Sequence, residues 1–337
     1  MSEDVIYMRV IQSLVGLIGI LGNSLVCVVI WRVRAMHTLT NAFIFNQAVV
    51  DLVASLLLLL VSNIDLSERV PPGVAGLLLC YLWITRFFLW SSFATSTTNL
   101  VALTVERYVA IVFPFKHQAY FGPRLAAVLI TACWSYGFAS SGFNLVWVTY
   151  SEPNGTCKPY ALPEPPVISA FMLLQMNFLL PVTVMCVAYC HIAVTLKRSA
   201  RRIAPGAHTS SASTQGSTTD VNTLDGSLAR ARRNTFKTLL MVFVVYVICW
   251  APNTAIFSLF LLGVNVDLGG VPYIVSLALV VCNSCANPIV YSVKYRQFRK
   301  GVRKLFRGTD GRPDNDADIS TVSARVSQRY TSSNLRK

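Results

Sequence analysis

The feature that most constrains this chain is a series of seven long apolar stretches. A helix needs about 20 mostly apolar residues to cross a membrane. The stretches cover residues 10–31, 42–62, 77–105, 126–148, 167–196, 238–262 and 271–293. They are continuously apolar and do not alternate with a period of two, which indicates helices and not the strands of a membrane barrel. The sequence therefore predicts an all-α membrane protein, a seven-helix bundle.

Basic residues lie almost entirely on one side of these predicted spans. Of the 29 lysines and arginines, 25 lie in the segments after spans one, three, five and seven. Such an excess marks the cytoplasmic side, so the C-terminus is predicted inside and residues 1–9 outside. The sequon at Asn154 lies in an outer segment, where glycosylation is expected. Topology accounts for the net charge of +14, so no nucleic-acid partner is implied. The first residues lack a basic region and a cleavage site, and no removable signal peptide is expected.

The chain divides into a short extracellular N-terminus (residues 1–9), a helical domain (10–306) and a cytoplasmic tail (307–337). The tail and the Ser/Thr-rich loop 203–229 have too few apolar residues to offset the entropy of ordering them, so both are predicted to be disordered. Residues 294–306 predict an amphipathic helix on the inner leaflet. Its apolar face consists of Phe298, Val302, Leu305 and Phe306.

Asp51 lies in the middle of the second span, where a carboxylate costs roughly 2.5–3.5 kcal/mol. Two interpretations are open. Asp51 is either a hydrogen-bonded structural acid or a cation or proton site. In the second case the polar partners on neighbouring spans are predicted to be Ser96, Asn283 and Ser284.

Prolines and cysteines add two further expectations. Pro181, Pro252 and Pro288 interrupt spans five, six and seven, and each removes a backbone hydrogen bond, which predicts hinges. Cys80 and Cys157 lie at outer membrane edges, and they are the only two of the nine cysteines there. Because that compartment is oxidising, a disulfide between them is expected.

These residues together resemble the rhodopsin-like class of G-protein-coupled receptors, over about 300 residues. The motifs that carry the resemblance are Gly22-Asn23, Asn46-Gln-Ala-Val-Val-Asp51, Glu106-Arg107-Tyr108 with Pro114, Trp134, Phe178-x-x-Pro181 with Tyr189, Cys249-Trp250-Ala-Pro252 and Asn287-Pro288-Ile-Val-Tyr291. Each motif is weak alone, but their order on seven spans is specific to this class.

The resemblance implies a role for each motif. Arg107, between Glu106 and Tyr108, would be the switch that meets the G protein, and Trp250 the toggle beneath the ligand. Tyr189 and Tyr291 would rearrange around Arg107 on activation. The remaining members of the switch are Pro252, Asn287 and Pro288. Asp51, Ser96, Asn283 and Ser284 match a pocket for an allosteric Na⁺, the one cofactor that the resemblance suggests. An agonist would act by shifting the population toward the state in which the sixth span moves outward.

The chain departs from the usual pattern at several positions. Arg232 stands where many relatives have an acid that restrains the arginine of the third span, which predicts appreciable basal signalling. Gln47 replaces the usual leucine, and Tyr246 the usual phenylalanine. Cys80 lies 27 residues before Arg107, two more than is typical of the class. No cysteine follows the amphipathic helix, so the usual palmitoyl anchor is missing.

The ligand is narrowed mainly by exclusion. The third span has no carboxylate before Glu106 to bind an amine, and the seventh has no lysine to bind retinal. Similarity to neuropeptide receptors and seven acids in the outer segments favour a cationic peptide. Alternatively, Arg86, which is expected to be buried near the outer end of the third span, anchors an acidic lipid or small anionic metabolite, unless it only snorkels. The predicted ligand pocket contains Arg86, Phe87, Trp90, Trp250, Asn253 and Phe257.

Partners follow from this interpretation. The protein is expected in the plasma membrane, with a heterotrimeric G protein on the cytoplasmic side. Serines and threonines of 209–227 and 309–333 are predicted targets of a receptor kinase, and arrestin would bind the phosphorylated segments. No catalytic motif such as HExxH, GxSxG or a P-loop is present, so no enzyme is predicted. A transporter or channel is the distant alternative, although the chain has no internal repeat.

Overall fold

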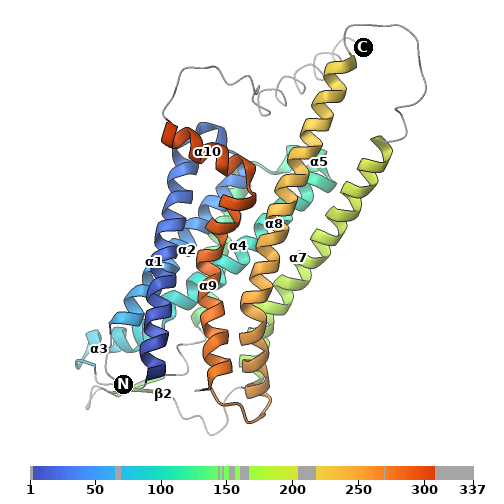
Figure 1. Cartoon of the computed structure of the whole chain (residues 1–337). Coiled ribbons are helices and arrows are strands. Elements are labelled where there is room, and N and C mark those ends of the chain that lie inside the picture. The colour runs from blue at the N-terminus through green and yellow to red at the C-terminus, as the bar shows by residue number, and fades with distance from the viewer. Residues whose placement is uncertain are drawn as a thin grey trace.

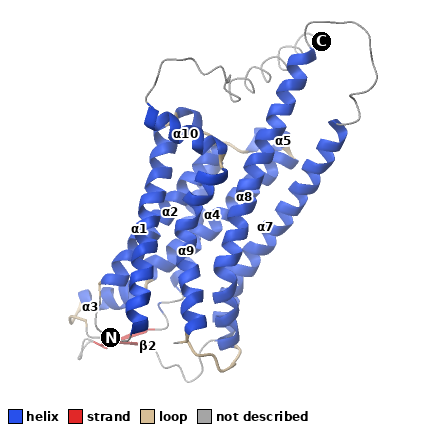
Figure 2. Ribbon diagram, viewed as in Figure 1, coloured by secondary structure: helices blue, strands red, loops and turns tan. Residues whose placement is uncertain are grey.

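The computed structural model describes residues 3–64, 70–142, 145, 148–151, 156–159, 167–203, 218–268 and 270–307. Within these ranges the chain is a bundle of long helices with one small hairpin (Figures 1 and 2). The helices are α1 (Glu3–Arg32), η1 (Arg34–Met36), α2 (Leu39–Asn63), α3 (Val74–Leu78), η2 (Leu79–Ile84), α4 (Phe87–Val112), α5 (Pro114–Tyr120), α6 (Pro123–Ser141), α7 (Val167–Ile203), α8 (Thr218–Leu261), α9 (Val271–Lys294) and α10 (Arg296–Arg307). The strands β1 (Val148–Ser151) and β2 (Thr156–Pro159) pair antiparallel.

Six of the helical segments in the described residues are long and apolar enough to cross a membrane. They are residues 6–32, 39–63, 74–112, 174–198, 233–261 and 271–294. The place of the fourth predicted span is taken by α6, whose 19 residues pack along α4. Its second half carries Ser135, Tyr136, Ser140 and Ser141 and is therefore less apolar. The prediction of an all-α membrane bundle is confirmed.

The two ends of the bundle differ in the elements that lie there, and we name them the disulfide end and the α10 end. The disulfide end holds the N-terminus, the β1–β2 hairpin and the bond between Cys80 of η2 and Cys157 of β2. The predicted pairing of these two cysteines is present. The α10 end holds α10 and the junctions of α2 with η1 and of α4 with α5 (Figure 1).

The third span is not one regular helix, as its unbroken apolar run suggested. It is divided into α3, a π-helical stretch η2 and α4. At the junction Arg86 has φ 55° and ψ 35°, the left-handed region. A π-turn holds more residues than an α-turn. The stretch from Leu79 to Ile84 therefore takes up more residues per turn than a regular α-helix would.

Close approach of α4 and α6 depends on a glycine. A Cβ atom on Gly137 would lie 2.0 Å from the Thr95 hydroxyl oxygen and 2.6 Å from the Ser91 carbonyl oxygen. Small residues allow membrane helices to approach this closely. Here the contact places Trp134 against α2, where its indole N–H donates to Asn46 Oδ1 at 3.1 Å.

The amphipathic helix α10 lies across the end of the bundle (Figure 1). Phe298 is buried in the main apolar core, and Val302 and Leu305 pack against it, whereas Phe306 is exposed. The predicted face is therefore confirmed for three of its four residues. Tyr295 separates α9 from α10 and donates to Asn41 Oδ1 at 2.8 Å. Burial raises the pKa of Tyr295 to about 12, so its hydroxyl stays protonated and keeps this bond.

The segments predicted to be disordered are only partly described. Helix α8 begins at Thr218, so residues 218–229 of the predicted disordered loop 203–229 are helical. Good helix formers predominate only from Leu228 to Arg233, so helix propensity accounts for the second part of this extension and not for its start at Thr218. Residues 204–217 and the tail 308–337 lie outside the described residues, as does Asn154.

Candidate functional site

At the α10 end, Glu106 and Arg107 form the centre of a small charged cluster. The Glu106 side chain is fully buried and ion-pairs with the Arg107 guanidinium next to it. It also contacts His117 Nε2 at 2.8 Å and accepts from the Thr40 hydroxyl at 3.4 Å. Arginine is thereby held against its own helix.

His117 belongs to α5, the short helix that Pro114 begins. No role for His117 was predicted from the sequence. The sequence signal that could have found His117 is its position ten residues after Arg107, in the short segment that follows Pro114.

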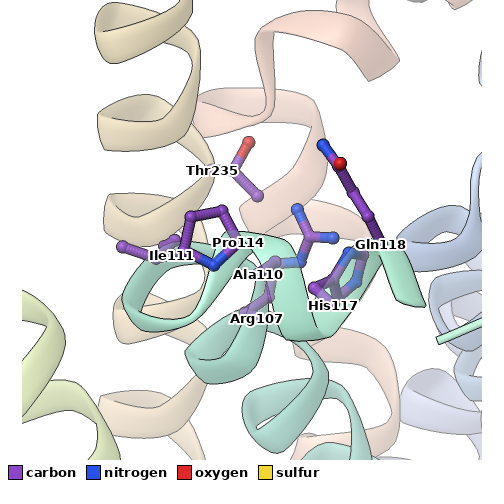
Figure 3. A pocket seen from close by; sticks show the side chains of 7 residues that line it. All are labelled: Arg107, Ala110, Ile111, Pro114, His117, Gln118 and Thr235. Carbon is purple, nitrogen blue, oxygen red and sulfur yellow. The ribbon is translucent and has the colours of Figure 1, made fainter. Parts of the chain in front are cut away.

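A cavity of about 170 Å³ lies beside this cluster. Figure 3 shows the side chains that line it around the Arg107 guanidinium. They come from three helices, α4, α5 and α8, and are Arg107, Ala110, Ile111, Pro114, His117, Gln118 and Thr235. The cavity therefore lies where movement of α8 relative to α4 would change access to Arg107.

The tyrosines of the predicted switch are close to this end but are not bonded to Arg107. Tyr189 shares a hydrogen bond of 3.1 Å with Thr104, one turn from Arg107. The Tyr291 hydroxyl is buried and has no partner within the described residues. Tyr108 bonds to His191 Nδ1 of α7 at 3.0 Å. Their predicted rearrangement stays a prediction.

Asp51 lies in the middle of the bundle at the centre of a polar cluster. It is fully buried, and its carboxylate accepts from Asn287 Nδ2 at 2.7 Å and from Ser96 Oγ at 3.0 Å. Gln47 Nε2 lies 3.2 and 3.1 Å from the two carboxylate oxygens. The cluster joins α2, α4 and α9.

Two of the four predicted sodium-pocket residues do not bond to the carboxylate. Asn283 and Ser284 are buried on the same helix as Asn287. No hydrogen bond joins either one to Asp51 in the described part of the chain, and Ser284 Oγ has no partner there. Asn287, predicted as part of the switch, and Gln47, noted only as a departure, occupy these positions instead.

Aromatic rings form a column on the side of the bundle toward the disulfide end. The Trp90 and Phe93 ring centroids are 5.8 Å apart, and Phe93 lies 5.8 Å from Trp250. Trp250 then meets Tyr246 at 6.1 Å. The column thus connects two predicted pocket residues, Trp90 and Trp250, through Phe93, which was not predicted.

The other predicted pocket residues lie around this column. Asn253 is buried and donates to Ser276 Oγ of α9 at 3.1 Å. Phe257 packs on Phe260 of its own helix, and Phe87 stacks on Phe138 of α6. The indole N–H of Trp250 and the Thr254 hydroxyl are buried without a partner among the described residues. These two polar groups on α8 are available to a ligand.

Arg86 is exposed, so the expectation that it is buried is wrong. It lies at the break between η2 and α4, as the N-cap residue of α4. Among the described residues it is the one non-glycine residue with a positive φ. Non-glycine residues in this conformation mark strained positions that often have a function.

The left-handed backbone at Arg86 leads to a prediction for the thermal stability of variants at this position. Left-handed conformation costs an L-residue with a Cβ about 1–2 kcal/mol, and most for a β-branched residue. Purified protein carrying Arg86→Val is therefore expected to unfold at a lower temperature than Arg86→Gly, with Arg86→Ala between them. Equal midpoints for Gly and Val would contradict a left-handed residue 86.

The prolines predicted as hinges lie inside the expected helices, Pro181 in α7, Pro252 in α8 and Pro288 in α9. Pro252 follows Trp250 by two residues. The toggle predicted for Trp250 therefore lies next to a point where α8 lacks a backbone hydrogen bond.

Helices crossing a membrane, a Glu-Arg-Tyr sequence at one end and a disulfide-tethered hairpin at the other define a seven-helix membrane receptor. Residues 22–291 match the profile of the 7 transmembrane receptor (rhodopsin family). The chain belongs to this family, which consists of receptors and not of enzymes.

Similar proteins fall among receptors named for peptides. Somatostatin receptor type 5 of Bos taurus is 29% identical over 333 residues, which cover 95% of this chain and 82% of the relative. Galanin receptor type 2 of Mus musculus is 29% identical over 302 residues, which cover 88% of this chain and 75% of the relative. Neuromedin-U receptor 2 of Mus musculus is 28% identical over 311 residues, which cover 88% of this chain and 74% of the relative. The predicted resemblance to neuropeptide receptors is confirmed.

Proposed function

We propose that this protein is a plasma-membrane receptor that binds an extracellular peptide and activates a heterotrimeric G protein. The disulfide end faces outward and the α10 end faces the cytoplasm. The observation that carries the proposal is Arg107, which borders a cavity between α4, α5 and α8 and is held there by Glu106. Outward movement of the α10 end of α8 would enlarge this cavity and admit the G protein.

A peptide ligand is supported by the names of the relatives and by the aromatic column. Rings at Trp90, Phe93 and Trp250 present apolar area. The unpartnered Trp250 N–H and Thr254 hydroxyl would bond to polar groups of the peptide. A receptor kinase and arrestin would act on serines and threonines of 209–227 and 309–333, which lie outside the described residues.

The test is a signalling screen in cells that express the receptor, with sensors for each G-protein class. The first probes are somatostatin, galanin and neuromedin-U peptides, followed by a wider neuropeptide library. A hit is expected to lose its signal in Arg107→Ala while surface expression and binding of the labelled peptide persist. A peptide signal of equal size in Arg107→Ala would contradict the proposed coupling.

A second candidate ligand is an acidic lipid or small anionic metabolite anchored by Arg86. The exposed cation with a left-handed backbone favours it. A lipid library screened in the same cells, with Arg86→Ala and the charge-preserving Arg86→Lys, separates the two candidates. An anion anchored here would lose potency in Arg86→Ala and recover part of it in Arg86→Lys. Unchanged potency of an anionic agonist in Arg86→Ala would exclude this anchor.

A further inference from the structure

We infer that the side-chain amide of Gln47 takes the place beside Asp51 that the family resemblance gives to a sodium ion, so that this receptor does not respond to sodium. The inference concerns a cation that the chain was expected to bind. It rests on which atoms surround the carboxylate, and it does not depend on the ligand or the G protein.

The hydrogen bonds of Asp51 can be counted against its capacity. A carboxylate offers about four lone-pair directions on two oxygens. Oδ1 has Gln47 Nε2 at 3.2 Å and Ser96 Oγ at 3.0 Å. Oδ2 has Gln47 Nε2 at 3.1 Å and Asn287 Nδ2 at 2.7 Å. Gln47 has two N–H groups for three acceptors, one of which is Ser96 Oγ, so the N–H group that faces Asp51 is shared by its two oxygens. With Ser96 and Asn287, three of the four lone-pair directions of the carboxylate therefore receive a hydrogen.

The orientation of the Gln47 amide is set from its other side. Its Oε1 accepts from Asn99 Nδ2 at 2.8 Å, which an N–H group at that position could not do. The nitrogen must then point to Asp51 and to Ser96 Oγ. Asn99 is itself held by Asn46, which donates to its Oδ1 at 2.9 Å. Gln47 is completely buried, so the amide is not free to turn away.

The donor set around Asp51 does not fit a hard cation. Such ions are bound by oxygen atoms, whereas two of the three side chains on this carboxylate present N–H groups. Ser96, the predicted oxygen ligand, directs its proton at Asp51 and faces the Gln47 amide with its oxygen. A sodium ion would have to displace the N–H groups of Gln47, which within the described residues donate to Asp51 and to Ser96 Oγ.

Leucine at position 47 is a clean way to remove the amide. Asn99 Nδ2 would lose Gln47 Oε1 but keep the Phe43 carbonyl oxygen at 3.1 Å. Ser96 Oγ would be released, and Asp51 would keep only Ser96 and Asn287. The variant Gln47→Leu therefore opens lone pairs on both Asp51 and Ser96 for a cation.

The test compares thermal unfolding of purified receptor in NaCl and in KCl at equal concentration. A ligand that binds only the folded state raises its unfolding temperature. The wild type is expected to unfold at the same temperature in both salts, and Gln47→Leu several degrees higher in NaCl. The added Na⁺ effect should vanish in Gln47→Leu/Asp51→Asn. Ser55→Ala, whose hydroxyl bonds to the Asp51 backbone oxygen at 2.6 Å, is the matched control and should behave as wild type.

Two results would overturn the inference. A wild type stabilised by NaCl as much as Gln47→Leu would show that the amide does not exclude the ion. Absence of any NaCl effect in folded Gln47→Leu would show that the amide is not what excludes it. If the leucine variant does not fold, Gln47→Met, which is unbranched and fills a similar volume, is measured in its place with the same two expectations.

Discussion

Replacing Glu106 by glutamine is expected to raise ligand-independent signalling about tenfold. The Glu106 carboxylate is the buried partner of Arg107 and also contacts His117. The neutral amide would release an arginine that borders the cavity between α4, α5 and α8. If this ion pair favours the resting state by about 1.4 kcal/mol, its loss changes the population of the active state about tenfold. The measurement is G-protein activation without ligand, at matched surface expression and against empty vector.

Two variants at neighbouring positions serve as comparisons for the basal signalling of Glu106→Gln. His117→Ala removes one contact of Glu106 but leaves Arg107 paired, so a smaller rise is expected. Tyr108→Phe removes the bond to His191 at 3.0 Å without touching Glu106, and should leave basal signalling unchanged. Equal basal activity in wild type and Glu106→Gln would refute the restraint and with it part of the proposed coupling mechanism. The same experiment measures the basal signalling that Arg232 predicts; the Arg232 side chain lies outside the described residues.

The second large effect is expected from Gly137→Val, which should nearly abolish folded receptor at the cell surface. Even a Cβ would lie 2.6 Å from the Ser91 backbone oxygen, and valine adds two further carbons. Overpacking of this kind costs about 1–3 kcal/mol or more, a large share of the total of about 5–15 kcal/mol that holds a typical protein folded. Helices α4 and α6 would have to separate, and the Trp134–Asn46 bond would break.

The matched control for this packing effect lies five residues along the chain. A Cβ on Gly142 meets nothing within 4 Å, so Gly142→Val should reach the surface at close to the wild-type level. Gly137→Ala should lie between the two valine variants. The readout is the fraction of receptor that binds a surface label and elutes as a single species after solubilisation. Equal surface levels for Gly137→Val and Gly142→Val would contradict the close α4–α6 contact.

The membrane spans and the disulfide could be predicted from the sequence, because each follows from the order of apolar and polar segments along the whole chain. Apolar runs marked the spans, and the position of Cys80 and Cys157 in outer segments marked the disulfide. It did not reveal the break at Arg86, because an apolar run carries no information on whether a backbone turns left-handed. The helical start of α8 at Thr218 was also missed, because residues 218–223 are weak helix formers with few apolar side chains.

The mid-bundle cluster shows where prediction from sequence stops. Asp51 and Ser96 were placed correctly, because a buried acid must find polar partners. Gln47 was seen only as an unusual residue. Its role depends on the direction of its amide, which is set by Asn99 on another helix, 52 residues away. Such a contact has no local sequence signal.

The same cluster has a consequence for how the protein is made. Helices enter the membrane in chain order, so the Asp51 carboxylate, Gln47 and Asn99 are in place long before α9 emerges from the ribosome. Asn287, 236 residues after Asp51, supplies the last and shortest bond to the acid. Until then the Asp51 carboxyl group lies in the membrane without the hydrogen bond from Asn287. We therefore expect the hydrogen bonding of Asp51 to be completed only when α9 packs against α2, late in assembly. Defects at Asn287 should therefore appear first as immature receptor retained during biosynthesis, before any effect on signalling is seen.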